Sequence, residues 1–217
     1  MATSTELVGF PRVVPVFAIS GVLLLPGGRL PLTVFEPRYL ALTDDALGAG
    51  RLFALVQPAP NTVTDTVVPG LYSVGTLARI SAFGETGDGR YIITALGIAR
   101  FRLAGEVEGR SGYRRVLAEY GPFAADSLPQ IGPAVDRRRL VGAVSAYLSR
   151  QGLSTDLAKL ESAPDTELVT ALAMASPLSP EEKQALLEAP TTLERARLMT
   201  AMFEMALLAE AGDTIVH

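Results

Sequence analysis

The chain has 217 residues, of which 48% are hydrophobic and only 6% aromatic, and a formal net charge of −4. This length accommodates one large domain or two small ones, and the few aromatic residues predict mostly aliphatic cores. Nucleic-acid-binding proteins usually carry an excess of basic residues, which this chain does not have, so we do not expect a nucleic-acid partner. The absence of cysteine excludes disulfides, thiolate metal sites and cysteine nucleophiles, and it fits the cytoplasmic location that we expect.

The first half of the chain has the pattern of a β-rich domain. Apolar residues alternate or form short blocks between Gly and Pro, which predicts strands at Val13–Phe17, Arg29–Val34, Phe53–Val56, Leu71–Phe83, Tyr91–Leu96, Ala99–Val107 and Arg114–Tyr120. One helix interrupts the series, with Pro37 in its first turn and Leu40 and Leu47 on its buried face. Many short antiparallel strands with one included helix are typical of a partly closed barrel.

No stretch of this sequence is long enough and apolar enough to predict a membrane span. The longest apolar run, Val13 to Leu25, is interrupted by Pro15, Ser20 and Gly21. A membrane-crossing helix needs about 20 apolar residues in succession. We therefore do not expect a membrane partner.

The second half changes to helical periodicity. We predict a β-barrel subdomain over residues 10–121, a linker rich in Pro, Gly and Asp over residues 122–132, and a helical bundle over residues 133–211. Two helices are predicted at Arg137–Arg150 and Asp165–Ala175. Two more begin with capping boxes, in which a hydroxyl residue is followed three positions later by Glu: Ser179 with Glu182, and Thr191 with Glu194. Four helices with short connections predict a small bundle.

The residues needed for the common catalytic sites are missing. A phosphate-binding Walker loop requires Gly directly before its Lys, but the two lysines, Lys159 and Lys183, follow Ala158 and Glu182. The single histidine is the last residue, His217, which leaves no base for serine–histidine catalysis and no histidine-based metal site. We therefore predict no catalytic residues, no cofactor and no metal.

Several ordered motifs resemble the Lon protease amino-terminal domain family. The opening of that family is similar to Pro15-Val16-Phe17, Leu25-Pro26-Gly27, Leu30-Pro31-Leu32 and Phe35-Glu36-Pro37-Arg38-Tyr39. The segments 75–80 and 97–103 resemble two of its inner strands, and the segment 178–188 resembles its helical part. The resemblance covers about residues 10 to 210.

The resemblance implies an α+β fold, in which a PUA-like β pseudo-barrel is followed by a small helical bundle. In full Lon proteases this region recognises substrates and helps assembly, upstream of an ATPase and a serine–lysine peptidase. We therefore expect a stand-alone form without those two domains: a non-catalytic module that binds protein or peptide, as an adaptor or a sensor of unfolded polypeptide. The alternative is an RNA-binding PUA-like module, which rests on fold analogy alone. Besides an unfolded or partner polypeptide, a second copy of the chain in a homodimer is the other partner considered.

One pair of candidate binding residues, Arg38 and Tyr39, lies on the first turn of the predicted helix of the β-rich half. The competing interpretation of Arg38 is an ion pair or hydrogen bond with Glu36 or with nearby backbone. Phe35, just before this turn, is expected in the core.

The other candidate binding residues are three methionines of the last helix: Met199, Met202 and Met205. Methionine is flexible and polarisable, and a methionine-rich face adapts to many partners. The competing interpretation is that this stripe packs the bundle.

Overall fold

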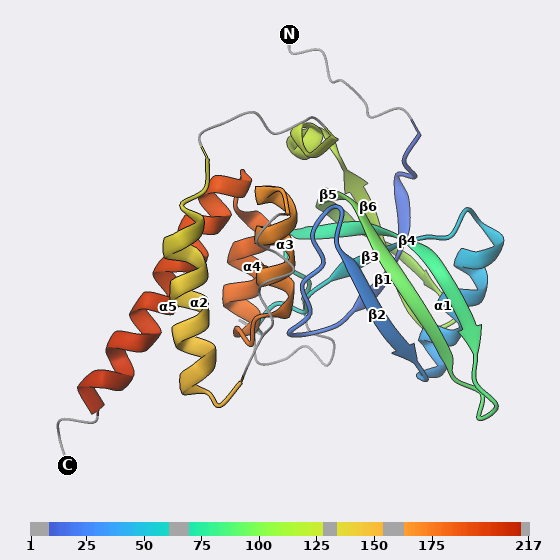
Figure 1. The fold of residues 1–217 in the computed structure, drawn as a ribbon. Coiled ribbons are helices and arrows are strands. Elements are labelled where there is room, and N and C mark those ends of the chain that lie inside the picture. The colour runs from blue at the N-terminus through green and yellow to red at the C-terminus, as the bar shows by residue number, and fades with distance from the viewer. Residues whose placement is uncertain (1–8, 61–69, 128–133, 154–162, 214–217) are drawn as a thin grey trace, which may run out of the picture. The chain divides into compact units, whose positions relative to one another are not determined.

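The computed structural model describes residues 9–60, 70–127, 134–153 and 163–213. The chain divides into two compact units. A β-rich unit comprises Met1–Pro129 and Leu178–Leu187, and a helical unit comprises Gln130–Pro177 and Glu188–His217. Figure 1 shows the elements of both units.

The β-rich unit is built on one six-stranded sheet with the order β2-β5-β4-β3-β1-β6 and a further β5–β6 pairing. Its strands are β1 (Val13–Ala18), β2 (Arg29–Val34), β3 (Leu52–Val56), β4 (Val74–Glu85), β5 (Tyr91–Arg110) and β6 (Tyr113–Glu119). β1 and β3 are parallel, and all other pairs are antiparallel. Because β6 pairs with both β1 and β5, the strands β5, β4, β3, β1 and β6 form the predicted pseudo-barrel.

β5 serves two parts of the sheet because it is 20 residues long. Its C-terminal half pairs with β6, whereas its N-terminal half pairs with β2. At this end β2, β5 and β4 form an extension of the barrel (Figure 1). Two separate strands were expected here, so this expectation is wrong. The sequence pattern breaks at Gly97 and Ile98 because the β4–β5 register shifts there, and a Cβ on Gly97 would lie 2.2 Å from the Leu25 carbonyl oxygen.

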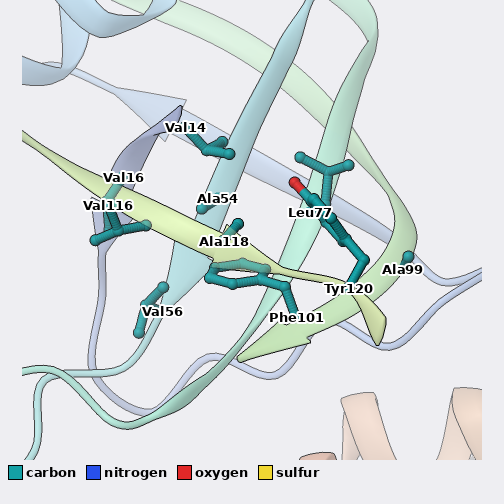
Figure 2. Close-up of a cluster of buried hydrophobic side chains, with 10 residues drawn as sticks. All are labelled: Val14, Val16, Ala54, Val56, Leu77, Ala99, Phe101, Val116, Ala118 and Tyr120. Carbon is teal, nitrogen blue, oxygen red and sulfur yellow. The ribbon is translucent and has the colours of Figure 1, made fainter. Parts of the chain in front are cut away.

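The interior of the barrel is filled by small and branched side chains around two aromatic rings, which Figure 2 shows. The cluster consists of Val14, Val16, Ala54, Val56, Leu77, Ala99, Phe101, Val116, Ala118 and Tyr120. These residues alternate along their strands, as one inward-facing side of a sheet requires. The Tyr120 hydroxyl donates to the Pro11 carbonyl oxygen at 2.9 Å, so this buried polar group is satisfied.

Helix α1 (Pro37–Gly48) covers the other face of β1 and β3. The ring of Phe17 lies 4.7 Å from that of Tyr39 and 4.9 Å from that of Phe53, measured between centroids. β1 and β3 are therefore buried on both faces, which explains their nearly continuous apolar sequence.

Helix α4 (Pro180–Glu188) belongs with the barrel, although its sequence pattern placed it in the expected helical bundle. Two buried amide side chains carry the contact: Gln57 Nε2 donates to the Pro180 carbonyl oxygen at 3.0 Å, and Gln184 Nε2 donates to the Val74 carbonyl oxygen at 3.1 Å. Lys183 Nζ also donates to the Gly21 carbonyl oxygen at 2.8 Å. Helical periodicity shows that a segment has an apolar face but not which partner covers it.

A buried ion pair joins three segments of the β-rich unit. Arg100 of β5 and Asp126 of η1 (Gly121–Ser127) approach to 2.6 Å, with side chains 3% and 5% exposed. Arg100 Nη1 also donates to the Leu187 carbonyl oxygen at 2.8 Å, and the guanidinium carbon lies 4.6 Å from the ring centroid of Phe123. Residues 121–127, which overlap the expected linker at 122–132, therefore form part of this unit.

The helical unit consists of α2 (Arg137–Arg150), α3 (Asp165–Ala175) and α5 (Thr192–Asp213). The first two have the predicted bounds. α5 packs against both α2 and α3, and its buried Phe203 lies 4.9 Å from Tyr147 of α2 between ring centroids. No helix in the described part of the chain is long and apolar enough to cross a membrane.

Removal of the Asp126 charge should destabilise the β-rich unit strongly. Asp126→Asn leaves the buried Arg100 guanidinium without its counter-charge, so we expect the free energy of unfolding in urea to fall by about 3–5 kcal/mol. Glu204→Gln is the matched control, because Glu204 pairs with Arg139 at a far more exposed site. An equal loss in the two variants would contradict the central role of the Arg100–Asp126 pair.

The predicted capping box at Ser179 is present. The Glu182 amide donates to Ser179 Oγ at 3.2 Å, and the Ser179 amide donates to Glu182 Oε2 at 2.8 Å. Ser179→Ala should therefore lower the free energy of unfolding by about 0.5–2 kcal/mol. Ser179→Asp, which keeps an acceptor at the cap, should retain most of the stability in the same urea titration. A Ser179→Ala curve that matches the unmodified protein would show that the cap contributes nothing.

Candidate functional site

Tyr39 is a buried residue that joins α1 to β1. Its side chain is 6% exposed, its hydroxyl donates to the Ala18 carbonyl oxygen at 2.9 Å, and the Ala18 amide donates to that hydroxyl at 3.2 Å. Burial raises the pKa of the Tyr39 hydroxyl above its ordinary value, so this group stays a neutral hydrogen-bond donor. These contacts give Tyr39 a packing role.

Arg38 is half-exposed, but its charge is already paired. Its Nη2 lies 2.7 Å from Glu36 Oε2, and its Nε donates to the same oxygen at 2.9 Å. The guanidinium carbon also lies 4.5 Å from the ring centroid of Tyr39. The intrachain interaction with Glu36, weighed as an alternative from the sequence, is therefore the one that forms.

The three methionines of α5 lie in different environments. Met199 is completely buried, Met202 is partly buried, and Met205 is 62% exposed. Leu208, which is 72% exposed, follows Met205 by three residues and so lies beside it on one face of the helix. Met205 and Leu208 form an exposed apolar pair, whereas Met199 is fully buried.

The β2–β5–β4 extension carries an apolar surface that sequence reasoning missed. Phe35 is 63% exposed and Ile92 is 51% exposed, so the expectation that Phe35 lies in the core is wrong. Val34, the last residue of β2, is buried, and Phe35 follows it directly after the strand. Successive residues of an extended chain project to opposite faces, and this alternation was the available sequence signal.

Phe35 follows closely on the residue of β2 that pairs with Ile92. Thr33 pairs directly with Ile92 in the β2–β5 register, and Phe35 comes two residues after Thr33, one position beyond the end of β2. Diagonal neighbours in an antiparallel pair lie about 7–8 Å apart, so an extended continuation of β2 by one residue brings an aromatic side chain within reach of Ile92. We group Phe35 and Ile92 on this basis as one exposed apolar patch.

The patch lies on a face that is mostly uncharged. On β5, Ile92 pairs with Thr33 and Gly84, and Thr94 pairs with Pro31 and Ala82. We call this surface the open face, defined by Pro31, Thr33, Phe35, Ala82, Gly84, Ile92 and Thr94. The opposite face of the same strands turns towards α1, where a hydrogen bond from the Tyr91 hydroxyl to Asp44 raises the pKa of Tyr91.

The edge of β2 is less suited to binding than the open face. β2 is the terminal strand of the sheet order, so a partner strand would add at its outer edge. Pro31 lies in the middle of this strand and has no backbone N–H to donate. A peptide added to this edge would lack one ladder hydrogen bond, which favours side-chain contacts on the open face instead.

The helical unit also contains a groove between the start of α2 and α5. Its volume is about 440 Å³, and Asp136, Arg139, Arg197 and Thr200 contribute to a largely polar lining. Arg139 forms a bidentate pair with Glu204, with both nitrogen–oxygen distances at 2.8 Å.

Within the described residues, no three carboxylate or imidazole groups come together as a metal site would need.

Loss of the Tyr39 hydroxyl should reduce stability without a change in binding. Tyr39→Phe leaves the backbone groups of Ala18 without this partner, so we expect the free energy of unfolding to fall by about 1–3 kcal/mol. Tyr72→Phe is the control, because the hydroxyl of Tyr72 makes no hydrogen bond to a described residue. Urea titration measures the loss. Weaker capture of unfolded polypeptide by a fully stable Tyr39→Phe variant would instead place Tyr39 in the binding surface.

Comparison with solved structures supports the predicted fold. The Lon N-terminal domain protein from Xanthomonas campestris has a TM-score of 0.60 and 24% sequence identity, over 87% of this chain and 97% of that chain. The N-terminal domain of a Mycobacterium avium complex Lon protease has a TM-score of 0.56 and 19% identity, over 88% and 98%. At this level of identity the likeness shows a shared fold.

Curated relatives and a family model together identify the family, and the family model is decisive. Lon protease 2 of Myxococcus xanthus is 26% identical over 87% of this chain and 23% of its own length, and the Lon protease of Anaeromyxobacter dehalogenans is 27% identical over 87% and 22%. The chain thus spans less than a quarter of the length of these relatives. A family model described as the ATP-dependent protease La (LON) substrate-binding domain matches residues 13–204. This chain belongs to the family of Lon substrate-binding domains.

Proposed function

We propose that this chain is a polypeptide-binding module that contacts apolar segments of its partners through the open face. The observation that carries the proposal is the exposure of two large apolar side chains, Phe35 and Ile92, at the same end of the β2–β5 pair. The family supports it, because its description names a substrate-binding domain of a protease, and the substrates of a protease are polypeptides.

The energetics favour weak and adaptable contacts. Complete burial of a Phe or Ile side chain contributes about 1.5–3 kcal/mol, and roughly half of each side chain is still available in Phe35 and Ile92. Two such contacts supply about 1.5–3 kcal/mol in total. Because hydrophobic contact is non-directional, this surface suits segments of many sequences.

We infer that the module acts without catalysis of its own, as an adaptor or a sensor of unfolded polypeptide. The matched region corresponds to a substrate-binding domain, and the polar side chains described above are paired for structural reasons. Arg38 pairs with Glu36, Arg100 with Asp126 and Arg139 with Glu204. These pairs stabilise the chain or its surface and provide no nucleophile–base arrangement.

The exposed apolar pair on α5 is the competing surface. Met205 and Leu208 have the adaptable character expected of a binding face, and they lie on one side of a helix. The open face is favoured because it includes an aromatic anchor, Phe35, whereas the α5 pair contains no aromatic side chain. Aromatic anchors dominate binding at many protein interfaces.

Variants of the two surfaces should separate these alternatives. The probe is fluorescein-labelled, reduced and carboxymethylated α-lactalbumin, a chain that stays unfolded, and binding is measured by fluorescence anisotropy. The double variant Phe35→Ser and Ile92→Thr should weaken binding by roughly tenfold, which is the factor that corresponds to about 1.4 kcal/mol. Its melting temperature should change little because both side chains are exposed.

Met205→Ser with Leu208→Ser is the matched control and should leave the affinity nearly unchanged. The opposite result, with loss in the α5 variant alone, would move the binding surface to α5. Tighter binding of a labelled single-stranded RNA, with a steep fall in affinity as salt rises, would contradict polypeptide binding and favour the RNA-binding alternative.

A further inference from the structure

Two arginines lie in one cross-strand row at the barrel end of the open face. In the sheet register, Leu96 of β5 pairs with Arg29 of β2 on one side and with Arg79 of β4 on the other. Both arginines are exposed, whereas Leu96 between them is partly buried. Directly paired residues project from the same face, so Arg29 and Arg79 flank Leu96 on the face that carries Ile92.

The charges of this arginine pair are not neutralised within the described part of the chain. Three other exposed arginines have carboxylate partners there: Arg38 has Glu36, Arg90 has Asp88 and Arg110 has Asp45. Neither Arg29 nor Arg79 has an ion pair with a described residue. Among the described residues, the structure thus presents two positive charges without a carboxylate partner beside an apolar patch.

The spacing of the two arginines suits a single bridging anion. They are separated by two strand spacings, about 10 Å between their Cα atoms. Arginine stems can lie along the apolar surface of Leu96 while their guanidinium groups stay in water, which brings both charged groups towards the space above it. A carboxylate has two oxygens and accepts from two guanidinium groups at once, and it relieves the repulsion between them.

The distance from the arginine pair to the apolar patch defines how many residues of a bound polypeptide separate its two contacts. Ile92 lies four residues from Leu96 along β5, about 14 Å in a strand. An extended polypeptide covers this distance with four residues, and side chains four positions apart project to the same side. A single extended segment therefore places an acidic side chain at the arginine pair and a large apolar side chain at Phe35 and Ile92.

We infer that Arg29 and Arg79 together bind the side-chain carboxylate of an Asp or Glu in the bound polypeptide, four positions from an apolar residue. This inference rests on the proposed function and narrows it, since it names the segments that the module prefers. A nucleic-acid backbone fits less well, because it carries a charge at every nucleotide and the next row of the face, Pro31, Thr94 and Ala82, is uncharged.

Matched peptides test the inference. Each is short, fluorescein-labelled and amidated at its C-terminus, with one Glu four positions from the first of two alternating Phe residues in a Ser and Thr background. One peptide has the Glu before the Phe residues and a second has it after them, so that both chain directions are tested. Each of these peptides has a matched partner with Gln in place of Glu. Binding to the unmodified protein is measured by anisotropy titration. In at least one direction, the Glu peptide should bind about threefold to tenfold more tightly than its Gln partner, as expected for exposed charge contacts.

Variants assign this preference to the arginine pair. Arg29→Gln with Arg79→Gln should bind Glu and Gln peptides equally and retain the affinity of the unmodified protein for the Gln peptide. Arg12→Gln with Arg138→Gln makes the same change in net charge at other exposed positions and should keep the preference. Phe35→Ser should weaken both peptides by the same factor and leave their ratio unchanged. In about 1 M salt, where the Debye length is about 3 Å, the ratio should approach one.

The outcomes distinguish the inference from the function on which it rests. Equal binding of Glu and Gln peptides by the unmodified protein, or a preference that survives in the Arg29→Gln and Arg79→Gln variant, would overturn the inference and leave polypeptide binding intact. Failure to bind either peptide in either direction would overturn both. A Gln peptide with a free C-terminal carboxylate that binds as tightly as the Glu peptide would overturn the assignment to an acidic side chain.

Discussion

The organisation of the β-rich unit depends on the buried pair between Arg100 and Asp126. A charged group is unfavourable in an apolar interior unless it is paired and its remaining donors are satisfied. Arg100 meets this requirement with partners from two other segments, Asp126 of η1 and the Leu187 carbonyl oxygen at the end of α4. These segments are 26 and 87 residues away along the chain. The need to satisfy one guanidinium therefore brings η1 and α4 onto the barrel.

The same strand that carries Arg100 also creates the open face. The C-terminal half of β5 closes the barrel with β6, whose Val116 and Ala118 face the barrel interior. Its N-terminal half runs beyond the barrel with β2 and β4, where α1 lies towards one face and the other carries exposed side chains. A sheet covered on one side only presents its second face to solvent. Phe35 and Ile92 are exposed for this reason, and Arg29 and Arg79 lie at the junction between the two parts.

The stability of this unit and the proposed binding thus depend on different interactions. The barrel is held by an aliphatic interior, by buried amide contacts from Gln57 and Gln184, and by the Arg100 pair. The open face contributes little to folding, because its apolar side chains remain partly in water. Such a surface can change its side chains without loss of the fold. This separation is consistent with a family whose members share a fold at low sequence identity.

The sequence by itself determined the features that depend on neighbours within a few residues. Helix starts are of this kind, since the Ser179–Glu182 cap forms between groups three positions apart. Most strand positions followed from apolar spacing in the same way, and the ordered motifs pointed to the family and through it to the α+β fold.

Only the tertiary structure decided which surface each element buries. Tyr39 and Met199 were candidates for binding, yet both are buried, and Tyr39 is hydrogen-bonded to Ala18 of β1. Phe35 was expected in the core but is exposed, because the barrel closes without covering its side of the extension. The pairing of Leu96 with Arg29 and Arg79 depends on the register of three strands, and α4 joins the barrel through partners more than 100 residues away. Periodicity along a chain defines a face, but contacts between distant segments determine what covers it.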